Sequence, residues 1–461
     1  MKNTVVRLEK IEIENLKNVK KGELAFQGWQ NIKKNVRSNS TDILGIYGQN
    51  GSGKTAVIDA LNILRNIVSG KELDKEIGSL IRATEDRIQL IFTFHIEQKK
   101  EIESKCFLVS YTINVGKLDN KLCVTKEKVL FSELVEEKWS SQKVLIDYDI
   151  EYGENVIKPK YRYNEIIKKK EHILGLNLAK ALSQKVSTSF IFSSETLDIL
   201  TNSLEKDLIL ILQSIKFFTQ LNLIIFSNNH LSVVNMNEII PLSIRLENEE
   251  DLITGAVAVK LFEQSVINKE KFKVLSEVMD QINVVINALI PDLNISIINY
   301  GDQLMDDGKI GVKVELVSIR KDLTIPLKCE SDGIKKIISI LSALIAMYNN
   351  PSICLAIDEL DAGIFEYLLG ELLEVLQKNA KGQFIFTSHN LRALEKMNKD
   401  SILFTTTNPE NRYIRLSNVK NNNNLRDFYL RGIMLGGQKE CIYQETNSYE
   451  ISYAFRRAWG N

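Results

Sequence analysis

The N-terminal third of the chain is dominated by alternating apolar and polar residues. Residues 4–13 (VVRLEKIEIE) and 87–96 (RIQLIFTFHI) show this period of two, and it recurs through 106–155. Such alternation is typical of strands with one buried face, and turn sequences such as KLDNK separate the runs. We therefore predict antiparallel β structure in this part of the chain.

The pattern becomes helical after about residue 158. Apolar residues recur at helical spacing through 164–290, most clearly over 198–218 and 269–290. No heptad repeat is sustained long enough for a long coiled coil. Beyond this part we predict strands at 293–299 and 310–318, a helix at 333–348, and strands at 352–357 and 383–387 separated by a helix.

A phosphate-binding loop is predicted near the N-terminus. Residues 42–68 read as a buried strand, a glycine-rich loop and an apolar helix, and Gly48 to Thr55 fit G-x-x-x-x-G-K-[ST]. Backbone N–H groups of such a loop wrap phosphates, its lysine reaches the β- and γ-phosphates, and its hydroxyl residue binds Mg²⁺. The predicted ATP-binding residues are Gly48, Asn50, Gly51, Ser52, Gly53, Lys54 and Thr55.

A second group of candidates follows two later strands. The apolar run from Ser352 ends in Asp358 and Glu359, and the strand before His389 is the next along the chain. An acid at a strand end beside a P-loop suits Mg²⁺, so we assign Asp358 to the metal with Thr55 and Glu359 to the attacking water. A histidine at the next strand end can contact the γ-phosphate. The alternatives are a solvated acidic turn and a histidine with a structural hydrogen bond.

A further anion site is predicted where Ser331 and Gly333 begin the helix IKKIISILSALIAMY. Serine and glycine at a helix start expose a hydroxyl and backbone donors. An ordinary N-cap is the alternative, but the position just upstream of Asp358 favours phosphate contact.

The order of these motifs resembles the ABC-type ATPase heads of the RecF/SMC kind. The resemblance implies that two subunits sandwich ATP, that Ser331 and Gly333 act on the partner's nucleotide, and that Asp361 belongs to the loop contacting the partner. It implies an α/β fold: an ABC-type P-loop head with an antiparallel β subdomain and an inserted, mostly helical subdomain. The expected parts are ATPase lobes at 1–105 and 301–420, a β subdomain at 106–157, the insertion at 158–300 and a tail at 421–461.

The stretch IPLKCESDGIKK, the compact insertion and NLRDFYLRG further resemble the ATPase subunits of anti-phage systems such as PARIS, Septu, retron and abortive-infection operons. That resemblance implies a slow ATPase that gates a separate effector, for example a nuclease or toxin. Ile334 departs from the family pattern, in which threonine is common after the glycine. A glutamine loop cannot be located, although Gln98 and Gln184 are candidates.

The charge composition bears on whether DNA is a partner of this protein. Lys+Arg and Asp+Glu each number 59, so the formal net charge is zero, whereas dedicated DNA binders are usually basic. Two basic stretches, 158–170 and 17–37, are interpreted as a helix start and a loop between strands. We expect a cytoplasmic protein without a membrane span or signal peptide.

Other functions remain open. Asp147 and Asp149 form a D-x-D within an alternating strand, and only four histidines occur, so we expect no nuclease centre. The competing functions are a DNA-repair or chromosome-associated ATPase acting directly on DNA, and an ATP-binding scaffold with negligible turnover.

Overall fold

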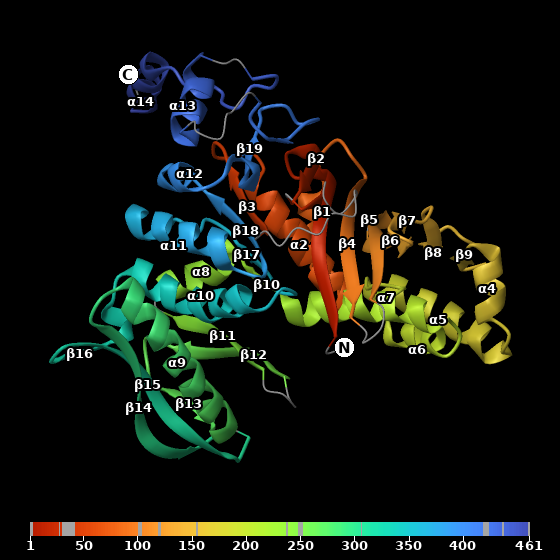
Figure 1. Ribbon diagram of the computed structural model, residues 1–461, viewed down its shortest axis with the longest axis horizontal. Coiled ribbons are helices and arrows are strands. Elements are labelled where there is room, and N and C mark those ends of the chain that lie inside the picture. The colour runs from red at the N-terminus through yellow and green to blue at the C-terminus, as the bar shows by residue number, and fades with distance from the viewer. Residues whose placement is uncertain are drawn as a thin grey trace.

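The computed structural model is built on two large sheets (Figure 1). No helix in the described part of the chain is long and apolar enough to cross a membrane. The structure describes residues 3–26, 28–29, 42–99, 104–118, 121–153, 155–236, 238–247, 252–305, 307–417, 424–435 and 438–459.

The six-stranded sheet holds the motif-bearing strands in the order β10-β17-β18-β3-β19-β20. The first five are mutually parallel, and only the last pairs antiparallel. Apolar residues fill both faces, as in other covered parallel sheets. The strands are β3 (Asp42–Tyr47), β10 (Leu223–Phe226), β17 (Cys354–Ile357), β18 (Gln383–Ser388), β19 (Ile402–Thr405) and β20 (Tyr413–Ile414).

Alternate residues of this sheet enter two separate cores. On β3, Leu44 and Ile46 pack with α2 (Lys54–Val68), whereas Ile43 and Tyr47 pack in the other core. The second core contains the helices that follow the other motifs. These are α10 (Asp332–Asn349), α11 (Glu366–Asn379) and α12 (Arg392–Lys396).

The eight-stranded antiparallel sheet has the order β2-β1-β4-β5-β6-β8-β9, with β7 beside β6. It joins the first core, and the Gln383 side chain ties the two sheets by bonding both the N–H and the carbonyl of Leu8 at 2.7 Å. The elements are β1 (Thr4–Leu16), β2 (Val19–Ala25), α3 (Ile77–Leu80), β4 (Arg87–Gln98), β5 (Lys105–Leu118), β6 (Lys121–Val135), β7 (Lys138–Trp139), β8 (Lys143–Asp149) and β9 (Ile157–Lys158).

The middle of the chain forms two further groups. The first is helical and packs on the antiparallel sheet: α4 (Lys160–Ile166), α5 (Lys170–Val186), α6 (Ser194–Thr201), α7 (Lys206–Phe217) and the π-helix η1 (Phe218–Asn222). The second is mixed: α8 (Asn228–Asn235), β11 (Ile239–Glu247), β12 (Leu252–Lys260), β13 (Ser265–Asn268), α9 (Lys269–Leu289), β14 (Leu293–Leu304), β15 (Ile310–Arg320), β16 (Leu323–Pro326) and the 3₁₀ turn η2 (Leu327–Cys329).

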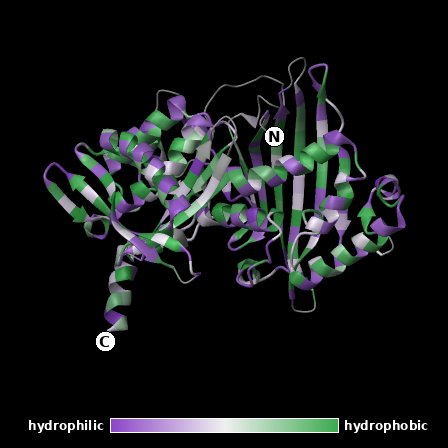
Figure 2. Cartoon of the chain, turned by 90° about the horizontal axis from the view of Figure 1, so that it is seen from below, coloured by the Kyte–Doolittle hydropathy of each residue, from purple (hydrophilic) through white to green (hydrophobic). Residues whose placement is uncertain are grey.

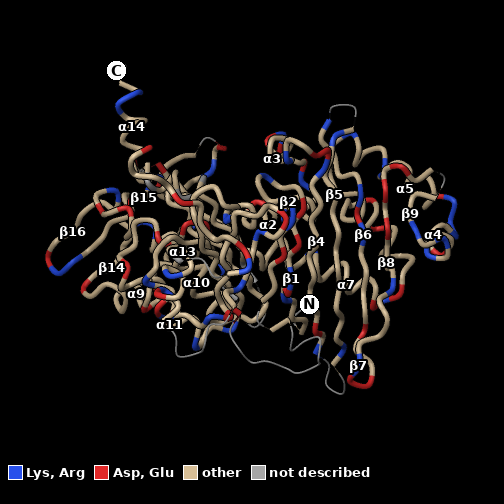
Figure 3. The backbone as a smooth tube through the Cα atoms, turned by 90° about the horizontal axis from the view of Figure 1, so that it is seen from above, with Lys and Arg blue, Asp and Glu red and all other residues tan. Residues whose placement is uncertain are grey.

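The C-terminal part contains η3 (Lys399–Ser401), α13 (Leu425–Leu435) and α14 (Ser448–Ala458). Leu425 and Tyr429 are buried in the second core, and the Tyr429 ring stacks on Phe404 at 4.6 Å between centroids. By contrast, α14 buries no residue and extends away from the body (Figures 2 and 3).

The α/β fold with an antiparallel β region is confirmed, but three expectations need correction. The part at 158–300 is mostly helical, but it is not one separate subdomain, because β10 lies in the central sheet beside β17 and β11–β13 form strands outside that sheet. The β region at 106–157 is not separate from 1–105, since both build one sheet. The stretch 17–37 is not all loop: 19–25 form β2, while residues 27 and 30–37 lie outside the described residues.

Two buried acids, Glu9 on β1 and Asp42 at the start of β3, interact electrostatically. The Asp42 carboxylate bonds Arg7 at 2.6 Å, but the fully buried Glu9 has no hydrogen-bond partner among the described residues. Burial, reinforced by the charge of Asp42, raises the pKa of Glu9 to about 8. The folded protein therefore holds this proton after the unfolded chain has released it.

This pair predicts that the free energy of unfolding depends on pH. Between pH 4.5 and about 8 the folded state binds more protons, so the free energy of unfolding falls as pH rises. Glu9→Gln should remove that dependence and stabilise the fold by up to about 1.4 kcal/mol per pH unit in this window. Urea unfolding across pH measures it, with Glu14→Gln on the same strand as control. An equal pH slope in Glu9→Gln and wild type would contradict the assignment.

Candidate nucleotide site

The P-loop lies between the buried strand β3 and the helix α2. Gly53 caps the helix with φ of 97°, a conformation that side chains with a Cβ rarely adopt. The Lys54 ammonium donates to the carbonyls of Gly48 and Gln49 at 2.9 and 3.0 Å. Burial lowers the pKa of Lys54, and the carboxylates of Asp358 and Glu359 act against that shift. Asn50 and Gly51 are exposed at the loop tip.

Three residues that sequence reasoning missed support this loop. The Thr405 hydroxyl, at the end of β19, donates to Ser52 Oγ at 2.6 Å. The Tyr413 hydroxyl donates to the Gly53 carbonyl at 2.7 Å, and the Asn18 amide donates to the Gly51 carbonyl. They come from distant segments, so no local motif could have indicated them.

The two predicted metal ligands are brought together. Thr55 Oγ1 lies 3.5 Å from Asp358 Oδ1, which also accepts a 2.5 Å bond from Thr387 Oγ1. Burial raises the pKa of Asp358, although the two threonine hydroxyls lower it. Asp358 Oδ2 is buried without a hydrogen-bond partner in the described part of the chain. A buried carboxylate oxygen beside a hydroxyl at a P-loop fits a Mg²⁺ ion completed by phosphate oxygens and water.

The contacts that position Glu359 are made by its backbone rather than by its carboxylate. Its N–H donates to Thr387 Oγ1 at 2.7 Å, and its φ of 46° bends the chain sharply after β17. The Lys336 ammonium donates to the carbonyls of Glu359 and Ala362 at 2.6 and 3.1 Å. Lys336, which sequence reasoning also missed, is a buried lysine of α10. Burial lowers the pKa of Lys336 to about 8.

His389 and Asp361 are neighbours. Asp361 Oδ2 accepts the His389 backbone N–H at 3.1 Å, and the imidazole ring is exposed. Partial burial and the charge of Lys54 lower the pKa of His389, while Asp361 opposes this, so a neutral ring is favoured at pH 7.

The predicted Ser-x-Gly helix start is joined to the Asp361 loop. Ser331 is the exposed N-cap of α10 and its side chain makes no capping bond. A Cβ on Gly333 would lie 1.9 Å from the Gly363 carbonyl oxygen, so only glycine permits this close approach. Glu330, just before Ser331, is buried against Arg320 and Ser318; burial alone would raise the pKa of Glu330, but these hydrogen bonds lower it.

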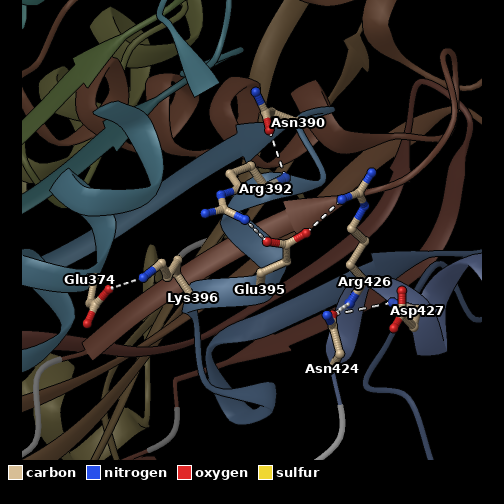
Figure 4. A network of polar contacts seen from close by, with 8 residues as sticks. All are labelled: Glu374, Asn390, Arg392, Glu395, Lys396, Asn424, Arg426 and Asp427. Atoms are coloured by element: carbon tan, nitrogen blue, oxygen red, sulfur yellow. Dashed lines mark hydrogen bonds and ion pairs between the residues drawn. The ribbon is translucent and has the colours of Figure 1, made fainter. Parts of the chain in front are cut away.

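A charged network follows His389 (Figure 4). On α12, Lys396 pairs with Glu374 of α11 at 2.8 Å, and Glu395 contacts Arg392 on the same helix. Glu395 also pairs with Arg426 of α13 at 2.7 Å. The segment after the predicted γ-phosphate contact is thus tied to both α11 and the C-terminal part.

The remaining candidates lie elsewhere. Asp147 and Asp149 face Lys128 and Lys126 across β6–β8 at 3.6 and 3.5 Å. Among the described residues, no group of three or more His, Cys, Asp or Glu side chains could hold a metal ion. Of the predicted glutamine-loop candidates, Gln98 ends β4 and Gln184 lies on α5.

In the basic stretch 158–170, the charged groups are partly engaged. The Lys158 ammonium lies 3.8 Å from the Tyr152 ring centroid, and Arg162 pairs with Glu165 at 2.7 Å. The stretch contains the start of α4, as predicted for a helix start.

Three solved structures show what the chain is similar to. They are an Smc head bound to the C-winged helix domain of ScpA (14% identity, TM-score 0.43, covering 89% of this chain and 98% of that one), the SMC head domain from Thermotoga maritima (12%, 0.37, 89% and 99%), and the recombination mediator RecF with ATPrS (12%, 0.36, 86% and 97%).

No curated protein matches the sequence. A family of ATPase domains does match, over residues 43–395, which include the P-loop, the acidic strand and His389. Because the match spans most of the chain, the chain belongs to the family described as "AAA domain, putative AbiEii toxin, Type IV TA system".

Proposed function

We propose that this protein is an ATP-hydrolysing switch subunit of a cytoplasmic anti-phage defence system, which pairs head-to-head on ATP and gates a separate effector. The observation that supports hydrolysis is the convergence of Lys54, Thr55, Asp358 and Glu359 at one end of parallel strands. The family description names a toxin and a Type IV TA system, which supports a link to a toxic activity.

Each residue has a defined part in the reaction. Lys54 leaves the carbonyls of its own loop to bind the β- and γ-phosphates of ATP. Thr55 and Asp358 would hold Mg²⁺, which neutralises charge on the phosphate oxygens when bound. Glu359 accepts a proton from water as the water oxygen attacks the γ-phosphorus, and the bond to the β-phosphate oxygen breaks to give ADP and phosphate. His389 donates a hydrogen bond to the γ-phosphate.

Pairing is supported by the position of the Ser-x-Gly start. Ser331 is exposed and its hydroxyl caps nothing within its own helix, so it is available to a nucleotide presented by a second copy. Gly333 and Lys336 connect this helix to the loop 359–363. A movement of the helix on closure over the partner's phosphate would therefore be transmitted to Glu359 of the same chain.

Mixing two inactive variants tests the shared site. Ser331→Arg should bind ATP but neither pair nor hydrolyse it. Lys54→Ala should bind ATP about one to two orders of magnitude more weakly, too weakly for turnover at an ATP concentration that just saturates the wild type. A mixed dimer contains one intact site, built from the P-loop of the first chain and Ser331 of the second. ATPase activity should therefore return on titration of one variant with the other, while light scattering follows pairing.

Subunit exchange must be shown independently, for example with differently labelled chains. A mixture that exchanges subunits yet stays as inactive as its components would exclude sharing of the site. The protein would then hydrolyse ATP, if at all, as a single chain.

A further inference from the structure

The last helix of the chain, α14, presents an exposed apolar face. Ile451 and Phe455 on α14 and Trp459 directly after it lie at intervals of four and are 47, 76 and 88% exposed. Figures 2 and 3 show α14 standing clear of the rest of the molecule. An isolated helix of 11 residues is marginal in water, so α14 would gain stability from a surface that covered this face.

The start of α14 is tethered beside the P-loop. The Gln444 N–H donates to the Gln49 side-chain oxygen at 2.9 Å, and Gln49 lies inside the phosphate-binding motif. The Thr407 N–H donates to the Cys441 carbonyl at 2.8 Å, and Ile442 is buried. Because α14 begins only four residues after Gln444 (448 − 444), it leaves the body at the nucleotide face.

A second exposed aromatic pair follows the Asp361 loop. Phe365 and Tyr367 are 68 and 51% exposed, and their rings stack at 5.6 Å between centroids. Glu366 and Glu371 are exposed on the same helix, α11. This surface begins two residues after Gly363, the residue in contact with Gly333.

We propose that α14 of one copy docks on the Phe365–Glu371 surface of α11 in a second copy, clasping the ATP-bound pair. The inference rests on the proposed head-to-head pairing, which sets the P-loop of one chain opposite the Ser331–Gly363 region of the other. Gln444 of the first chain then lies near the start of α11 in the second. Arg456 borders the apolar face of α14 and Glu371 lies one turn after Tyr367 on α11, so their charges complement each other across this contact. Aromatic and arginine side chains are the usual anchors of protein interfaces.

Charge reversal distinguishes docking between chains from docking within one chain. Every chain carries Glu359→Gln to hold ATP-bound pairs. Arg456→Glu in one chain, and Glu371→Lys in another, should each weaken ATP-dependent pairing about tenfold, because every pair contains two such contacts. In the mixed dimer both tail–α11 contacts again join opposite charges, so pairing of the mixture should exceed that of either variant alone.

Sedimentation of each chain and of the mixture with ATP measures the effect. Reversal of Arg431 and Lys439, two exposed charges elsewhere in the C-terminal part, is the matched control and should leave pairing unchanged. Pairing that is insensitive to the tail reversals, or a mixture no better than its components, would overturn docking on the second copy. Absence of ATP-dependent pairing in the Glu359→Gln parent would instead refute the proposed function, and this inference with it.

Discussion

Replacing Lys54 by alanine is expected to weaken ATP binding by about one to two orders of magnitude, because a charged hydrogen bond contributes roughly 1.5–3 kcal/mol. The Lys54 ammonium is buried against the carbonyls of Gly48 and Gln49. ATP offers it phosphate oxygens instead, so the variant loses binding energy while the loop keeps its supports at Ser52 and Gly53. Titration with a fluorescent ATP analogue measures the affinity.

Lys71→Ala is the matched control, since Lys71 is an exposed lysine shortly after the same helix. Its affinity should equal that of the wild type. Unchanged affinity in Lys54→Ala, with the fold intact by circular dichroism, would refute the P-loop assignment and with it the proposed ATPase.

Glu359→Gln should have the opposite effect on pairing. Loss of the base should slow hydrolysis by about 10²-fold or more, because general-base catalysis contributes that much. The backbone at 359 should stay in place, since Thr387 and Lys336 bind its N–H and carbonyl rather than its carboxylate. ATP should therefore bind normally and the closed pair should accumulate.

Light scattering with ATP and single-turnover hydrolysis measure the two effects together. Glu277→Gln, an exposed acid on α9, should change neither. Normal turnover in Glu359→Gln would move the role of base to another group. Slow turnover without accumulation of pairs would separate hydrolysis from reopening and contradict the switch.

Local sequence determined the nucleotide-binding elements of this protein. A glycine loop between a strand and a helix has few other uses, and a short apolar run bounded by two acids is consistent with a buried strand that ends at those acids. The P-loop at 48–55, the acids after β17 and the helix starting beside Ser331 therefore follow from short-range chemistry, and the structure brings Thr55 to Asp358. The family match covers the P-loop, the acids and the Ser331 helix start.

Tertiary packing decided the rest. The four-residue strand β10 lies in a stretch with a helical pattern, and it is a strand because it completes the parallel sheet beside β17. In the sequence, Lys336 is one of several polar residues in a largely apolar helix, yet burial against the loop after Asp358 makes it a hydrogen-bond donor to that loop. Thr405 and Tyr413 reach the P-loop from more than 350 residues away in sequence. Such contacts depend on which strands become neighbours, and periodicity within one segment carries no information about its neighbours in the sheet.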